Sequence, residues 1–261
     1  RGPRRCPRPR RRGSSSLRLG KEAHHSAGWG EWSAYSTYFA TPDDPVDPGD
    51  PGDPGDPGDT VAPNTVVAKA RTWVLRGPSI RFSSPDTDVR GFHCRVDNGR
   101  WSACRSPYVP AWRAGSHVIR VRAVDEAGNV DASPASTVWT SPLDDRALRR
   151  AGRWAAGRGA AYYRGTVLSA RVRGAAVTTR TAVRAKGIAL VATKCRTCGV
   201  VDVYYGKRRL KRVSLRATTT RRGQIINIRS WGALQARKRI RVVVVSNKRL
   251  VQIDGIGIRT R

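Results

Sequence analysis

Short runs in which apolar and polar residues alternate, separated by turn-forming residues, occupy residues 61–141. The run SHVIRVRAV shows the alternation most clearly, because two arginines fall on one face and four other residues on the opposite face: His117, Ile119, Val121 and Ala123. Successive side chains of a strand point to opposite faces, so this run predicts a half-buried β-strand. Four similar runs predict further strands: SIRFS, GFHCRV, RWSAC and STVWT.

A second region, residues 153–261, repeats this pattern in eight runs. They are AYYRGTVLSAR, AVTTRTAV, GIALVAT, VVDVYYG, KRVSLRA, QIINIRSW, KRIRVVVVS and VQIDGIGIR. Their regular spacing predicts a β-sandwich or jelly roll. In KRIRVVVVS, Arg239 and Arg241 alternate with Ile240 and Val242, which predicts positive charge on an outward face of a sheet. The intervening stretch PLDDRALRRAG, residues 142–152, is predicted to be a connector.

The first 60 residues do not show this pattern. Residues 1–40 are predicted to be a disordered basic arm, with an aromatic segment after residue 27 that is a candidate for the tail of an upstream domain. Residues 41–60 repeat Pro-Gly-Asp and predict an extended linker, whose aspartates attract calcium but are held in no fixed cage. Because the chain contains no methionine, we expect it to be a processed product or a fragment.

Positive charge is concentrated in the C-terminal region. Of the formal net charge of +31, residues 146–261 contribute +28, and residues 41–60 contribute −7. Such a surface attracts polyanions, including nucleic acid, teichoic acid and acidic polysaccharide. A genome rich in G and C also raises arginine content, so the excess is only partly a functional signal.

Cys94 and Cys104 flank an Asp-Asn-Gly turn, and this spacing is compatible with metal ligands, redox thiols or a staple across a hairpin. A three-residue loop at 98–100 would place Cys94 directly opposite Cys104, at a separation that a disulfide can bridge. A zinc site needs two further ligands, and His93 points to the other face of the strand. The sequence therefore predicts a disulfide and no metal site.

The motifs FHCRVDNGRWSACRSPY and GSHVIRVRAVDEAGNVDASPASTVWT resemble the bacterial Ig-like domain that is repeated in many secreted actinobacterial proteins. The resemblance covers about residues 62–141. It implies an Ig-like β-sandwich that acts as a spacer or display element without catalysis, and it bounds a domain at residues 61–141.

The runs GIALVAT, VDVYYGKRRLKRVSL, KRIRVVVV and VQIDGIGI resemble the galactose-binding-like β-sandwich, which is related in fold to carbohydrate-binding modules. The resemblance covers about residues 150–259. It implies an all-β chain in which an Ig-like sandwich is followed by a basic jelly-roll domain at residues 153–261, and it implies a polysaccharide partner.

Cys195 and Cys198 form CRTC, the spacing of thioredoxin-like redox sites. A redox site needs a helix N-terminus that lowers a thiol pKa, but the run that follows here is a predicted strand. A disulfide within the loop is favoured, with free thiols or redox activity as alternatives. Paired cysteines in β-rich domains indicate an oxidising compartment, so a secreted or wall-associated protein is predicted.

Sugar-binding sandwiches use aromatic rings that stack on pyranose faces, together with a few polar groups. Six aromatic residues are candidates: Trp154, Tyr162, Tyr163, Tyr204, Tyr205 and Trp231. Adjacent tyrosines on a strand point to opposite faces, so one of each pair at most can serve. The prediction is Trp231 with Tyr205 or Tyr163, and Asp254 as a partner for a sugar hydroxyl or an arginine.

Enzyme chemistry is not expected of this chain. The four histidines accompany no nucleophile elbow, and the acidic residues after position 146 are only Asp202 and Asp254. P-loop and Rossmann fingerprints are absent, so no cofactor is predicted. The predicted function is a monomeric, non-catalytic module that binds polysaccharide or an anionic envelope polymer. The alternatives are the accessory domains of a secreted hydrolase and a nucleic-acid-binding protein.

Overall fold

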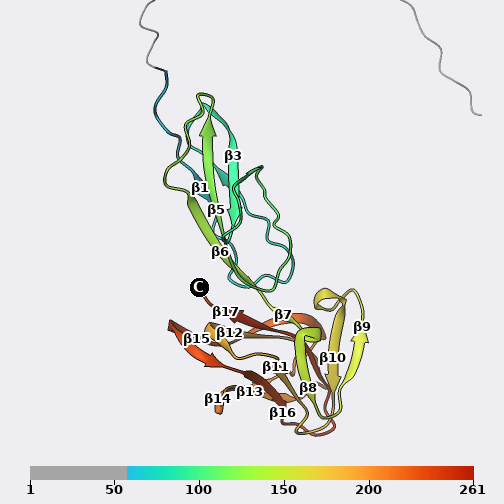
Figure 1. The fold of residues 1–261 in the computed structure, drawn as a ribbon. Helices are drawn as coiled ribbons and strands as arrows, with labels where there is room; N and C mark the ends of the chain where they lie inside the picture. Colours follow the sequence, from blue (N-terminus) through green and yellow to red (C-terminus); the bar gives the residue numbers. More distant parts are fainter. Residues whose placement is uncertain (1–57) are drawn as a thin grey trace, which may run out of the picture. The chain divides into compact units, whose positions relative to one another are not determined.

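The computed structural model describes residues 58–261, and the regular secondary structure of this part is almost entirely β-strand (Figure 1). Predictions for the basic arm, the aromatic segment and most of the Pro-Gly-Asp linker lie outside the described residues. No helix within residues 58–261 has the length and apolar character needed to cross a bilayer.

The first β module, residues 61–141, contains a two-stranded and a four-stranded sheet. Strand β1 pairs with β2, and the larger sheet has the order β4-β3-β5-β6. The bounds are β1 Val66–Val67, β2 Phe82–Ser83, β3 Val89–Val96, β4 Ser102–Cys104, β5 Gly115–Asp125 and β6 Ala135–Ser141. The alternation predicted for β5 is confirmed, since Ile119, Val121 and Ala123 are fully buried.

Cys94 and Cys104 form the predicted disulfide, with a Cα–Cα distance of 5.8 Å. The predicted register is wrong, because Cys94 pairs with Ser102 and Cys104 pairs with Phe92. The loop is longer than predicted. Asp97 follows the last residue of β3 and has a left-handed φ of 52°. Its carboxylate accepts a hydrogen bond from the backbone N–H of Val118. The cysteines are therefore diagonal neighbours on one face of the sheet.

Replacing both Cys94 and Cys104 by alanine is expected to lower the free energy of unfolding by about 3 kcal/mol, because the bridge closes a loop of about ten residues in the unfolded chain. Urea unfolding of the full chain measures the change. The matched double alanine variant of Cys195 and Cys198 opens a loop of sequence separation 3 and should cost about two-thirds as much. Equal losses in the two variants would contradict this account.

The C-terminal sandwich, residues 142–261, has two sheets. The β12 sheet has the order β15-β12-β17-β10-β9, with β7 added alongside β17, and the β13 sheet has the order β14-β13-β16-β11-β8. Two short 3-10 turns, η1 Asp145–Ala147 and η2 Tyr163–Gly165, join strands. The strands are β7 Leu143–Asp144, β8 Leu148–Ala151, β9 Ala155–Arg158, β10 Thr166–Ala170, β11 Ala176–Thr179, β12 Val183–Lys194, β13 Val200–Tyr205, β14 Arg208–Ser214, β15 Arg221–Lys238, β16 Ile240–Val244 and β17 Val251–Arg259.

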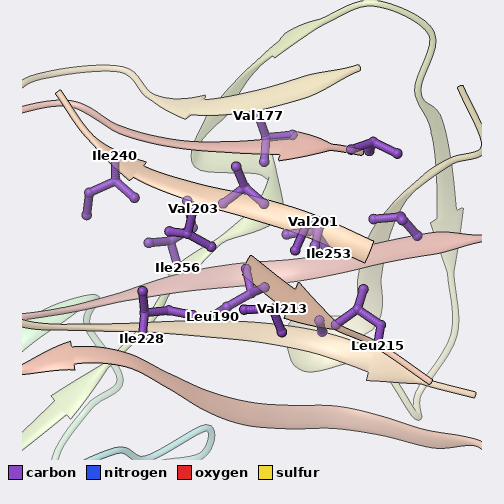
Figure 2. Close-up of a cluster of buried hydrophobic side chains, with 14 of the residues drawn as sticks. Val177, Leu190, Val201, Val203, Val213, Leu215, Ile228, Ile240, Ile253 and Ile256 are labelled. Atoms are coloured by element: carbon purple, nitrogen blue, oxygen red, sulfur yellow. The ribbon is translucent and has the colours of Figure 1, made fainter. Parts of the chain in front are cut away.

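The two sheets enclose an aliphatic core (Figure 2). Leu190 of β12 and Ile256 of β17 are paired on the β12 sheet, while Val203 and Val242 are paired on the β13 sheet. All four are at most 1% exposed. Burial of such side chains stabilises a fold by about 1.5–3 kcal/mol each, so this core fixes which face of every strand points outward.

The prediction that residues 142–152 are a connector is wrong. Leu143 and Asp144 form β7 on β17, and residues 148–151 form β8 on β11. Only one residue of β8, Leu148, is buried, because β8 lies at the edge of its sheet. An edge strand with one buried side chain shows no clear alternation, so the pattern did not reveal it.

Candidate functional site

Tyr205 and Trp231, two predicted sugar-binding residues, lie together with ring centroids 5.6 Å apart. Tyr205 is only 5% exposed and donates a hydrogen bond from its hydroxyl to the carbonyl oxygen of Val183, at 2.8 Å. Burial raises the pKa of the Tyr205 hydroxyl. Trp231 is half-buried and packs against the core. Tyr205 thus fills the interior, and Trp231 offers the more accessible ring of the two.

Tyr163 and Asp254, the other predicted ligand residues, are buried near the final strand. Tyr163 is 4% exposed, donates to the carbonyl oxygen of Pro142 at 2.8 Å, and has a pKa raised by burial to about 12. Asp254 is 0% exposed. Burial raises the pKa of its carboxyl to about 7, and the nearby charges of Asp145 and Asp144 add to this effect. A ligand does not reach either side chain without rearrangement of the chain around it.

Of the adjacent tyrosines Tyr204 and Tyr205, Tyr204 is the one that faces outward. Because neighbouring residues on β13 point to opposite faces, burial of Tyr205 in the core places Tyr204 on the outer face of the β13 sheet. Residues paired directly across antiparallel strands share a face. The pairing therefore assembles one row across the five strands of the β13 sheet: Arg209, Tyr204, Arg241, Thr178 and Arg149. We call this set the Tyr204 row.

The arginines of the Tyr204 row are exposed, and Arg241 lies close to the ring of Tyr204. The guanidinium carbon of Arg241 lies 4.9 Å from the ring centroid of Tyr204, within the range of a cation–π interaction. Strands are spaced about 4.8 Å apart, so the row spans roughly 20 Å of the surface. The predicted outward placement of Arg239 and Arg241 is confirmed, since Ile240 and Val242 beside them are buried.

One acidic side chain, Asp202, lies beside the row and is already paired. Arg212 donates two hydrogen bonds to its carboxylate, at 2.8 and 2.9 Å, and Arg209 approaches to 3.5 Å. The hydrogen bonds from Arg212 lower the pKa of Asp202, against the opposing influence of burial. Within residues 58–261, neither Arg149 nor Arg241 takes part in a salt bridge. These two cations are available to a ligand, and Arg209, which makes no hydrogen bond to Asp202 in the described part of the chain, is a third.

Arg149 and Thr178 also line a cavity of about 750 Å³. Residues of the two edge strands β8 and β9 form part of its wall. We call it the arginine cavity. Six arginines line it: Arg146, Arg149, Arg150, Arg158, Arg180 and Arg239. Its single carboxyl group, Asp145, has a pKa raised by burial. Arg146 pairs with Asp144 at 2.6 Å, which leaves a strongly positive lining.

This arrangement suits the binding of anions. Guanidinium groups make bidentate, charge-assisted hydrogen bonds to carboxylate and phosphate, the Thr178 hydroxyl both donates and accepts, and the Tyr204 ring offers a face for stacking. The row and the lining of the cavity contain neither histidine nor cysteine. The acidic side chains within residues 58–261 that are close enough to share a metal ion belong to the first β module instead.

Cys195 and Cys198 are joined as a disulfide, 7% and 1% exposed, as the favoured prediction stated. They precede β13, so their bond lies at the start of the strand that carries Tyr204. The bridge occupies both sulfur atoms, and its position supports a bracing role.

No known protein family and no curated protein matches the sequence. Among solved structures, similar chains include a family 6 carbohydrate-binding module from Clostridium stercorarium in complex with cellobiose. It is 13% identical, covers 46% of this chain and 94% of its own, and has a TM-score of 0.35. The C-terminal family 6 module of a laminarinase from Zobellia galactanivorans is 11% identical, over 46% and 97% of the two chains, with a TM-score of 0.31.

A family two carbohydrate esterase from Cellvibrio japonicus is also similar, with 12% identity, 45% coverage of this chain and a TM-score of 0.34. This chain spans 32% of the esterase. Several similar structures are thus carbohydrate-binding modules, but similarities of this size do not define a function.

Proposed function

We propose that this chain is a non-catalytic binding protein whose C-terminal sandwich holds an anionic polysaccharide or envelope polymer. The observation that carries the proposal is the continuity of the Tyr204 row with the arginine cavity through Arg149 and Thr178. A polymer needs an extended surface, and a row about 20 Å long that ends in a cavity provides one. The first β module, with its Ig-like resemblance, then serves as a spacer.

Acidic polysaccharide is favoured over nucleic acid. Single-stranded nucleic acid is held by a succession of aromatic platforms between cations, whereas the Tyr204 row offers one ring. The two disulfides support an oxidising compartment, so we infer a secreted or wall-associated protein. Trp231 stays a candidate for a second stacking contact, since its ring is partly exposed.

Titration of the full chain with polygalacturonate, teichoic acid, dextran and duplex DNA tests the proposal. Calorimetry at 50 and 300 mM NaCl should show binding of an acidic glycan that persists at the higher salt, at least tenfold tighter than binding of neutral dextran. Attraction by charge alone falls steeply as salt rises. If all polyanions bound equally at low salt and none bound at 300 mM, the proposal would be wrong.

A further inference from the structure

Three aspartates from separate segments of the first β module converge on one point. Asp59 ends the last Pro-Gly-Asp repeat, Asp88 directly precedes β3, and Asp125 is the last residue of β5. Each offers a carboxylate oxygen, and these oxygens all lie within 4.8 Å of one another. Three like charges at this separation repel one another unless a cation lies between them.

Asp125 is the member of this cluster that requires a partner. Its side chain is 0% exposed, and its Oδ2 atom has no hydrogen-bond partner, while Oδ1 accepts a bond from the backbone N–H of Asn129 at 2.7 Å. None of the three aspartates forms a salt bridge within residues 58–261. A buried carboxylate oxygen without a partner costs free energy, and coordination of a cation offsets this cost.

Hydrogen bonds that involve backbone and side-chain groups hold these segments in place. The Asn129 side chain donates to the carbonyl oxygen of Asp59 at 2.7 Å, and the backbone N–H of Glu126 donates to the carbonyl oxygen of Asp88 at 3.0 Å. The backbone N–H of Val61 donates to Oδ1 of Asp59 at 2.9 Å. The backbone at Asp59 and Asp88, and the carboxylates of Asp59 and Asp125, are therefore held by the module itself.

We propose that Asp59, Asp88 and Asp125 form a Ca²⁺ site. Carboxylate oxygens are hard ligands, which suit Ca²⁺ and Mg²⁺. Ca²⁺ accepts six to eight oxygens at about 2.3–2.6 Å in a flexible shell, whereas Mg²⁺ demands a near-ideal octahedron at about 2.0–2.1 Å and gives up its waters reluctantly. Carboxylates from three separate segments suit the more flexible shell of Ca²⁺. Three carboxylates completed by water give an affinity typical of extracellular modules, with Kd about 10⁻⁴–10⁻³ M.

Bound Ca²⁺ would join the last Pro-Gly-Asp repeat to the ends of β3 and β5. The sequence offers no cage for the linker aspartates, but the fold supplies one for Asp59. The position of Asp59 relative to β3 and β5 would then depend on calcium.

Equilibrium dialysis of the full chain against ⁴⁵Ca²⁺, in 150 mM NaCl with 1 mM MgCl₂, tests the site. One ion per chain is expected to bind with Kd about 10⁻⁴–10⁻³ M. Asp88 is an exposed member of the cluster, and Asp88→Asn should raise the Kd for Ca²⁺ at least tenfold. Asp125→Asn should abolish the binding. The melting temperature of the native chain should also rise by a few degrees in 5 mM Ca²⁺ relative to EDTA, and that of Asp88→Asn should not.

Asp86→Asn is the matched control, because Asp86 lies on the same segment and binds Ser84 and Asn64 outside the cluster. The Ca²⁺ affinity of the Asp86→Asn variant should equal that of the native chain. Undiminished binding in Asp88→Asn, equal loss in Asp86→Asn, or no stoichiometric binding by the native chain would each overturn the proposal. Because the readout is ion binding and not glycan binding, its failure would leave the proposed function untouched.

Discussion

Replacing Arg149, Arg209 and Arg241 together by glutamine is expected to weaken binding of polygalacturonate by the full chain about 100-fold at 150 mM NaCl. Each guanidinium of the Tyr204 row is exposed, so a charge-assisted hydrogen bond from it contributes about 1 kcal/mol in water. Three such losses sum to about 3 kcal/mol, and each 1.4 kcal/mol is a tenfold change in Kd. Calorimetric titration of the variant and the native chain measures the ratio.

A second triple variant separates the Tyr204 row from the charge of the whole chain. Arg221, Arg229 and Arg237 are exposed residues of β15, at the edge of the other sheet. Their replacement by glutamine also removes three positive charges from a chain of net charge +31, as the first variant does. We expect this variant to bind polygalacturonate within about threefold of the native chain, because long-range attraction is screened beyond about 8 Å at physiological salt. Equal losses in both triple variants would show that the binding is not localised to the row.

The strands of the C-terminal sandwich were largely predictable, because the alternation of apolar and polar residues that marks the core face is visible within each short run. All eight predicted runs contain strands, and the alternation in VVDVYYG correctly indicated that Tyr204 and Tyr205 face opposite ways. The missed elements, β7, β8 and β9, include an edge strand of each sheet. Strand β9 has no fully buried residue, so nothing in its sequence marks a core face.

The candidate site was less predictable because it depends on pairing between distant segments. Arg149 and Arg209 are 60 positions apart in sequence, and they share a row only through the register of three intervening strands. Residue composition reveals an excess of arginine, but it does not reveal the register in which the strands that carry these arginines pair. The same limit applies to Asp59, Asp88 and Asp125, since hydrophobic periodicity carries no information on where loop carboxylates meet.

Replacing Asp254 by asparagine is expected to stabilise the chain above pH 8 and to change its stability little at pH 5. The native carboxyl has a pKa of about 7, raised from 3.8 mainly by burial. Between these two values the folded chain binds a proton that the unfolded chain does not, so the free energy of unfolding falls as pH rises through this window. A shift of about three units corresponds to about 4 kcal/mol above pH 8. Asparagine carries no charge and avoids this cost.

Urea unfolding at pH 5 and pH 8, in EDTA, measures the difference between the variant and the native chain. The charged groups that face Asp254 are Asp144, Asp145 and Arg222, and all are retained in the variant. Asp202→Asn is the matched control of opposite sign. Arg212 holds the pKa of Asp202 below its ordinary 3.8, so the charged form stabilises the fold in full at any pH above that value. This variant should therefore lose the same stability at pH 8 and at pH 5, and the loss should shrink only below the ordinary pKa, as pH falls through the lowered one. If Asp254→Asn were less stable than the native chain at pH 8, the buried carboxylate would have to be stabilising, and its raised pKa would be refuted.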